Sequence, residues 1–176
     1  MHDAPEEVVW QGRYVTAKRK GRWEYVSRAR GIRAAVILAV DEGHVLLVEQ
    51  FRVPLGRVCL ELPAGLIGDD DGGEDESAET AAIRELEEET GYRAARMDSL
   101  GEFMSSPGMV SESFTLLRAI GLTKVGQGGG TEHEDITVHR VALDNLPQFV
   151  ADRRALGHAI DVRVALLLAG GMIEGD

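Results

Sequence analysis

Three glutamates near the middle of the chain have the spacing of a metal site. Glu85, Glu88 and Glu89 stand at positions i, i+3 and i+4 of a segment rich in Ala, Glu and Leu, so on a helix they share one face. Like charges at this spacing repel each other by about 0.2–0.5 kcal/mol per pair. A hard divalent cation such as Mg²⁺ removes that repulsion, because it prefers carboxylate oxygen. A solvated acidic helix face is the alternative interpretation.

The residues around the three glutamates favour the metal site over the solvated helix face. The stretch Arg84-Glu85-Leu86-x-Glu88-Glu89-x-Gly91-Tyr92, with Glu76 eight residues before its arginine, resembles the signature of the Nudix hydrolases. The opening glycine of that signature matches Gly65, but ten residues separate it from Glu76 where the family has five. The extra residues fall within Asp69–Gly73, a loop tip of the kind that tolerates insertions. The insertion therefore leaves the acidic helix intact.

Further segments resemble one branch of that family, the ADP-ribose pyrophosphatases. The matching segments are Glu49-Gln50-Phe51-Arg52, Glu61-Leu62-Pro63-Ala64-Gly65, Ser106-Pro107-Gly108 and Glu132-His133-Glu134-Asp135-Ile136. The resemblance implies hydrolysis of ADP-ribose to AMP and ribose 5-phosphate with Mg²⁺, or with Mn²⁺ in its place. It also implies a set of metal ligands: the carboxylates of Glu85, Glu88 and Glu89 and the backbone carbonyl of Ala64.

The same resemblance implies the catalytic residues. Glu134 matches the general base, which this branch carries on a mobile loop, and the nearby Glu132 is the competing candidate. The glycines of 126–130 predict that such a loop is flexible. Glu88 is expected to be a catalytic residue as well as a metal ligand. Arg84 is next to Glu85 and is expected to hydrogen-bond a carboxylate of the cluster, which fixes its rotamer.

Five residues are expected to bind substrate. The resemblance implies that Arg52 contacts a phosphate, that Arg28 helps to hold the substrate, and that Glu61 lies beside the metal site. It implies that Trp23 and Tyr14 stack on the adenine. The alternatives are a surface role for the arginines, a solvated strand position for Glu61 and plain strand packing for the two aromatic residues.

Two other functions fit the same residues. A diphosphatase of another nucleotide sugar, such as GDP-mannose, would use the same acidic helix with different base and sugar pockets. A non-catalytic ligand sensor is the alternative from another class. The complete set of Glu85, Glu88 and Glu89 argues against it, because a sensor need not retain all three carboxylates.

Composition excludes several classes. The 176 residues carry 30 acidic and 19 basic side chains, for a net charge of −11, which is the opposite of a nucleic-acid binder. No apolar run approaches the length of a membrane span, and the acidic N-terminus does not resemble a secretory signal. Cys59 is the only cysteine, so no internal disulfide forms, and a buried thiol is expected. These features predict a cytoplasmic protein that acts on a small molecule.

The order of apolar and turn segments predicts an α+β domain. We expect a helix–sheet–helix sandwich with a mixed β-sheet over residues 31–176, preceded by a β-hairpin extension over residues 1–30. Both tryptophans and two of the three tyrosines fall in that extension, which predicts that it pairs with a second copy in a homodimer. The expected strands are 34–40, 45–49, 58–62, 100–104, 114–120 and 136–142, and the expected helices are 77–90, 146–154 and 159–168.

Overall fold

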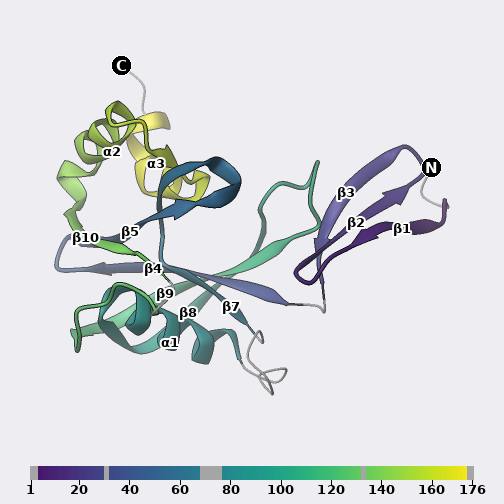
Figure 1. Cartoon of the computed structure of the whole chain (residues 1–176). Helices are drawn as coiled ribbons and strands as arrows, with labels where there is room; N and C mark the ends of the chain where they lie inside the picture. Colours follow the sequence, from purple (N-terminus) through teal and green to yellow (C-terminus); the bar gives the residue numbers. More distant parts are fainter. Residues whose placement is uncertain (1–3, 30–31, 68–76, 132–133, 174–176) are drawn as a thin grey trace.

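The computed structural model describes residues 4–29, 32–67, 77–131 and 134–173. Glu76, Glu132 and the expected loop insertion of 69–73 lie outside the described residues. The elements follow each other in one chain that folds into a small N-terminal sheet and a larger body (Figure 1).

The body is built on a mixed sheet. Its strands are β4 (Arg33–Asp41), β5 (His44–Arg52), β6 (Arg57–Glu61), β7 (Ala64–Ile67), β8 (Tyr92–Met104), β9 (Ser113–Lys124), β10 (Thr137–Ala142) and β11 (Ala159–Ile160). The order is β11-β6-β5-β4-β9-β8, while β10 also pairs with β5 and β7 with β4. The pairs β4–β9 and β11–β6 are parallel and the others antiparallel.

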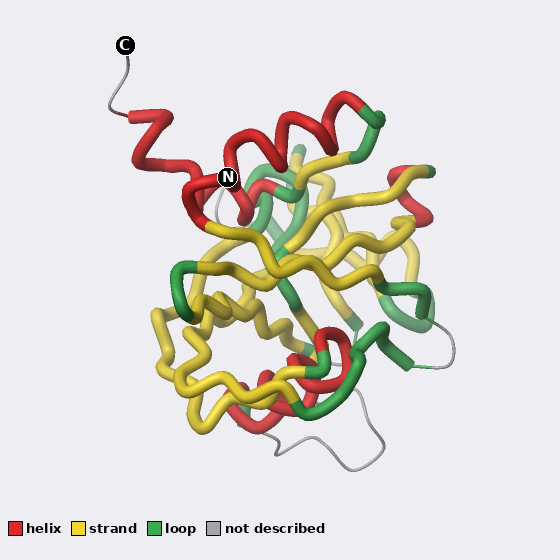
Figure 2. Tube along the Cα trace, turned by 90° about the vertical axis from the view of Figure 1, so that its left-hand side faces the viewer, coloured by secondary structure: helices red, strands yellow, loops and turns green. Residues whose placement is uncertain are grey.

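Helices cover both faces of this sheet, as Figure 2 shows. Helix α1 (Ala78–Thr90) packs on one face, and α2 (Leu146–Ala155) and α3 (Ala165–Ile173) lie on the other. Successive residues of a strand point to opposite faces. Ile37 therefore packs towards α1, while its neighbour Val36 packs towards Leu146 and Val164. The predicted helix–sheet–helix sandwich is confirmed.

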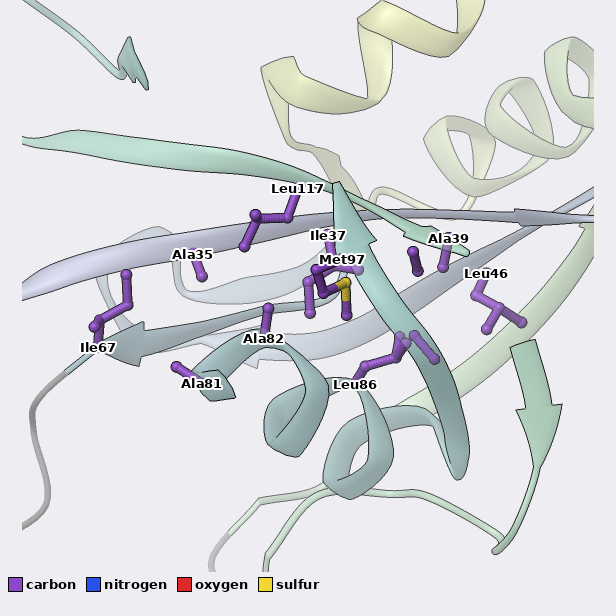
Figure 3. Packing of buried hydrophobic residues seen from close by; sticks show 12 residues of the cluster. Ala35, Ile37, Ala39, Leu46, Ile67, Ala81, Ala82, Leu86, Met97 and Leu117 are labelled. Carbon is purple, nitrogen blue, oxygen red and sulfur yellow. The ribbon is translucent and has the colours of Figure 1, made fainter. Parts of the chain in front are cut away.

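The core on the α1 side consists of small and branched side chains (Figure 3). Ala81, Ala82 and Leu86 of α1 lie against Ile37 and Leu117 of the sheet, and all five are fully buried. Small residues on α1 let the helix approach the sheet closely. The core thus sets the position of the three glutamates.

The N-terminal extension forms a separate sheet of three strands: β1 (Glu6–Gln11), β2 (Val15–Lys20) and β3 (Trp23–Arg28). Gly21 lies in the turn between the last two, with φ of 59°. Val26 joins this sheet to the loop before β9, because its N–H donates to Met109 O and its carbonyl accepts from Ser111 N, each at 3.0 Å. The sheet projects from the body in Figure 1.

One predicted element is wrong. The segment 159–168 does not form a single helix that ends at Gly170-Gly171. Ala159 and Ile160 pair with β6 as β11, a 3₁₀ turn η3 (Val162–Val164) follows, and α3 continues through both glycines to Ile173. The reason is Asp161, whose carboxylate accepts from Arg163 N at 2.8 Å and caps the turn.

Two other features bear on the predictions. Cys59 lies buried in β6 as expected, and burial, chiefly, raises the pKa of its thiol to about 12. None of the helices in the described ranges has both the length and the apolar character that a membrane-crossing helix needs.

Candidate active site

Helix α1 begins and ends where its sequence predicts. The Ser77 side chain accepts a hydrogen bond from Thr80 N at 3.1 Å, and Gly91 adopts φ of 71°, the left-handed conformation that closes a helix. Between these caps Leu86 lies in the core, and Glu85 and Glu89 line a cavity.

The cavity has a volume of about 910 Å³, and its lining has two parts that differ in composition. One wall comes from α1 and β7, with Glu85, Glu89, Ala64 and Gly65. The rest carries pairs of opposite charge and apolar side chains. Its main charged and aromatic residues are Arg28, Arg52, Glu61, Phe103, Glu112, Phe114, Glu134, Asp161 and Arg163.

Gly65 leaves the space that the Glu85 side chain of α1 occupies. A Cβ atom at this position would lie 2.0 Å from Glu85 Cδ and 2.4 Å from Glu85 Oε1. Gly65 is a residue of β7, paired with Ala35. The missing side chain lets the Glu85 carboxylate lie directly on the strand.

Glu89 is the most deeply buried of the three glutamates, with 4% of its surface exposed. Its Oε2 accepts a hydrogen bond from Ala64 N at 3.0 Å. Burial, chiefly, raises the pKa of Glu89 to about 8, and the charges of Glu85 and Glu134 add to the rise. A bound cation would favour the ionised form of this carboxylate. Oxygen donors from Glu85, Glu89 and the Ala64 backbone therefore fit a hard divalent cation.

Glu88 is turned away from this wall. Arg84 Nη1 donates to Glu85 Oε1 at 3.0 Å and to Glu88 Oε2 at 3.4 Å, as expected for a residue that orients the cluster. Glu88 does not line the cavity. Within the described ranges, no three His, Cys, Asp or Glu side chains are gathered closely enough to hold a metal ion as they stand. The role of Glu88 as a ligand stays a prediction.

Arginine–carboxylate pairs also line the cavity. Arg52 donates from Nε and Nη2 to the two oxygens of Glu61, at 2.6 and 2.7 Å. Arg28 Nε donates to Glu112 Oε1 at 2.5 Å. Both predicted arginines thus line the cavity, and Glu61 lies in it too, but each arginine is held by a carboxylate.

Three charged residues of the cavity were not predicted from the sequence. Glu112 follows the Ser106-Pro107-Gly108 segment, and Asp161 and Arg163 come from the region expected to be helix. They are far from the acidic cluster in sequence, and only the pairing of β11 with β6 brings Asp161 and Arg163 beside it. The alternation of acid and base in Asp161-Val162-Arg163 was the only sequence signal available.

The predicted base-stacking residues do not line the cavity of their own chain. Trp23 and Tyr14 are 52% and 58% exposed on the N-terminal sheet, and Trp10 is 57% exposed. The Arg13 guanidinium lies 5.2 Å from the centre of the Tyr14 ring. Packing within the chain, which was the alternative for Trp23 and Tyr14, is therefore slight.

Glu134 does line the cavity. Its Oε2 accepts hydrogen bonds from Thr131 N at 3.0 Å and Thr131 Oγ1 at 3.1 Å. Its charge is one of those that raise the pKa of Glu89. The residue thus lies in the same cavity as Glu85 and Glu89, and its function as a general base stays a prediction.

The glycine segment before Glu134 is bound to the end of α1. Gly129 N donates to Glu89 O at 2.8 Å and Gly130 N donates to Glu88 O at 3.0 Å. A Cβ at Gly128 would lie 2.4 Å from the Thr90 backbone. These glycines serve close packing and satisfy the last carbonyls of the helix, while the flexibility of the loop stays a prediction.

Comparison with known proteins identifies the family. The NUDIX domain model matches residues 29–159. The chain belongs to the Nudix family. A methanol dehydrogenase activator from Bacillus methanolicus is 36% identical over 121 residues, which cover 68% of this chain and 63% of that protein. An ADP-ribose pyrophosphatase from Bacillus subtilis is 34% identical over 120 residues, covering 68% of this chain and 62% of the relative.

One solved structure has the same architecture. The protein, described as an ADP compounds hydrolase, matches with a TM-score of 0.68 over 96% of this chain and 91% of its own, at 22% identity. That likeness shows the shared fold. The matches with the two Bacillus relatives span less than two thirds of the length of each.

Proposed function

We propose that this Nudix protein hydrolyses the diphosphate bond of ADP-ribose, giving AMP and ribose 5-phosphate, with Mg²⁺ or Mn²⁺. The observation that carries the proposal is a single cavity lined both by Glu85, Glu89 and Ala64 and by the arginines Arg28 and Arg52. A diphosphate carries negative charge. Divalent cations bound by the acidic residues and the guanidinium groups of the arginines would together neutralise it. The names of the relatives, among them ADP-ribose pyrophosphatases, support the choice of substrate.

Each residue has a part in this proposal. Glu85, Glu89, the Ala64 carbonyl and Glu88, once it turns from Arg84, would hold divalent cations. Bound there, the cations would lower the pKa of water and neutralise phosphate oxygens. Arg52 and Arg28 would orient the diphosphate. Glu134 would accept the proton of the attacking water, with Thr131 fixing its carboxylate.

A panel of substrates tests the proposal. With Mg²⁺ present, kcat/KM for ADP-ribose should exceed that for GDP-mannose and for nucleoside triphosphates, and the products should be AMP and ribose 5-phosphate. A higher value for GDP-mannose would support a diphosphatase of another nucleotide sugar. Binding without turnover of any compound would support the ligand sensor.

We also propose that the protein works as a homodimer in which the N-terminal sheet completes the partner's site. Val8, Val9, Trp10, Tyr14 and Trp23 are between 52% and 60% exposed on that sheet. So many large apolar side chains on a small projecting sheet mark an interaction surface. Pairing across a two-fold axis would bring Trp23 and Tyr14 to a substrate base.

Light scattering and a pair of substitutions test the dimer. The intact chain should have about twice the 19.1 kDa of one chain. Trp23→Ala should raise KM for ADP-ribose much more than Trp10→Ala, because only Trp23 is proposed to stack on the base. A mass of one chain at micromolar concentration would contradict the shared site. A cytoplasmic location remains part of the proposal.

A further inference from the structure

Two carboxylates, those of Glu61 and Glu89, are near enough to interact with Arg52. Glu61 of β6 binds it through both oxygens, at 2.6 and 2.7 Å. Glu89 of α1 is close enough for its charge to act on Arg52 as well. If Arg52 turned to Glu89 it would neutralise a carboxylate of the acidic wall. Its orientation therefore decides whether that wall stays available to cations.

The two hydrogen bonds to Glu61 also determine which guanidinium nitrogen of Arg52 is left to bind a ligand. Nε and Nη2 are both used by Glu61. A guanidinium has five N–H donors in a rigid fork, so the two hydrogens of Nη1 are left for a phosphate oxygen. The contact of Glu61 with Nε and Nη2 thus leaves Nη1 of Arg52 to bind the substrate.

Arg163 approaches the same carboxylate from the other side. Its Nη2 lies 3.8 Å from Glu61 Oε2, the oxygen that also accepts from Arg52 Nη2. Two guanidinium groups that share one oxygen repel each other. Arg52 is therefore confined to its own side of Glu61, provided that Arg163 keeps its place.

Arg163 is held in that place by two contacts. Its Nε and Nη2 donate to the two oxygens of Asp161, each at 2.6 Å. Its guanidinium also lies 5.5 Å from the centre of the Phe114 ring. Asp161 is in turn fixed to β6, because its N–H donates to Leu60 O at 2.9 Å, one residue before Glu61. The result is a row of alternating charges: Asp161, Arg163, Glu61 and Arg52.

From this row we propose that Asp161 and Arg163 are positioning residues, which hold Arg52 through Glu61 with its Nη1 towards the substrate. For the part that Arg52 plays towards a phosphate, the inference rests on the function proposed above. Arg163 itself makes no contact with substrate and acts only through Arg52.

A double-mutant cycle separates this indirect action from direct binding. Arg163→Gln alone should raise KM about five- to tenfold, with kcat within about twofold, because contacts in one charge network are strongly coupled. In an Arg52→Gln background the same change should alter KM less than about twofold. Arg163→Lys should fall between the wild type and Arg163→Gln. Full additivity of the two substitutions would overturn the proposal, because it would mean that Arg163 binds substrate by itself.

A second measurement does not depend on any substrate. The Nε–H of Arg52, held by Glu61, should exchange slowly with solvent, and its NMR signal can be assigned by its loss in Arg52→Gln. Arg163→Gln and Asp161→Asn should each speed that exchange by about tenfold or more. The matched control is Arg96→Gln, because Arg96 binds Asp98 through the same two nitrogens at 2.9 and 3.2 Å, but on the exposed strand β8.

The two measurements distinguish a failure of the positioning role of Arg163 from a failure of the proposed function. An exchange rate for Arg52 that Arg163→Gln leaves within twofold of the Arg96→Gln control would overturn the positioning role. If the wild type hydrolyses no compound of the substrate panel, the proposed function fails, while the exchange experiment still decides the role of Arg163. Melting temperatures of all variants show whether each one is folded.

Discussion

Gly65 lies where the side chain of Glu85 crosses β7, and a single methyl group there should separate folding from metal binding. In Gly65→Ala the new Cβ would meet Glu85 Cδ at 2.0 Å, Cγ at 2.1 Å and Oε1 at 2.4 Å. An ordinary van der Waals contact begins at 3.4 Å, so the carboxyl would have to withdraw by roughly 1.4 Å. The backbone conformation of Gly65 is not one that only glycine adopts.

The magnitudes of the two effects should differ. The atoms in the way belong to a flexible side chain, 15% exposed, so Glu85 can rotate aside. The cost in stability should therefore lie near the lower end of about 1–3 kcal/mol for overpacking. A metal ligand, however, must stand within about 0.2 Å of its proper distance. Affinity for a divalent cation should fall by about 10- to 100-fold, as when a ligand loses its orientation.

The assay measures Mn²⁺ binding by calorimetry and the melting temperature in EDTA, for the wild type, Gly65→Ala and Gly126→Ala. Gly126 is the matched control, because a Cβ there would meet only Gly91 Cα, at 3.9 Å. The control should bind Mn²⁺ as the wild type does. If Gly65→Ala binds Mn²⁺ within twofold of the wild type, the carboxylate of Glu85 is not a ligand in the position described, and the reasoning is refuted.

Three further substitutions address the other carboxylates. The raised pKa of Glu89 means that the folded protein holds a proton that the unfolded chain releases above about pH 4.5, so metal-free stability should fall by up to about 1.4 kcal/mol per pH unit between pH 5 and 8. Glu89→Gln should remove that slope in melting experiments, and an unchanged slope would contradict the assignment. Glu134→Gln should lower kcat by about 10²–10⁴-fold with KM nearly unchanged, whereas Asp135→Asn should not; a normal kcat for Glu134→Gln together with a low one for Glu132→Gln would identify Glu132 as the base. Glu49→Gln should cost about 1–3 kcal/mol of unfolding free energy at pH 7, because Glu49 is 7% exposed and bound at 2.8 Å by both His139 and His158. Burial alone would raise the pKa of Glu49, but the bonds from the two histidines outweigh it and hold that pKa below its usual range. The difference from the wild type should therefore shrink as the pH falls below about 4.5, and a difference that grew with falling pH would count against this explanation.

Local signals predicted the acidic helix and its limits well. Ser77 and Gly91 carry out the capping that their residue types suggest, and Leu86 lies in the core. These features depend on residues within one or two turns of each other, so propensity and spacing decide them. The hairpin between β4 and β5 and the turn at Gly21 were predictable for the same reason.

The rest of the site depends on pairing between distant strands, which no local pattern reveals. The segment 159–168 has helical composition, yet two of its residues add a strand to β6 and thereby bring Asp161 and Arg163 into the cavity. Likewise, the contact of Glu112 with Arg28 joins residues 84 positions apart. Tertiary contacts overrode local preference at each of these places.

The glycines of the site show how one residue type serves different physical needs. Gly91 supplies a left-handed backbone at the end of α1, which its sequence position predicts. Gly65 and Gly128 instead leave room for a side chain and for a backbone, respectively, and nothing local distinguishes them from turn or hinge residues. Because Gly129 and Gly130 bind the carbonyls of Glu89 and Glu88, the loop that carries Glu134 is fixed to the same helix end as the acidic cluster. A displacement of α1 would therefore move the three glutamates and the proposed base together, which preserves their distance from each other.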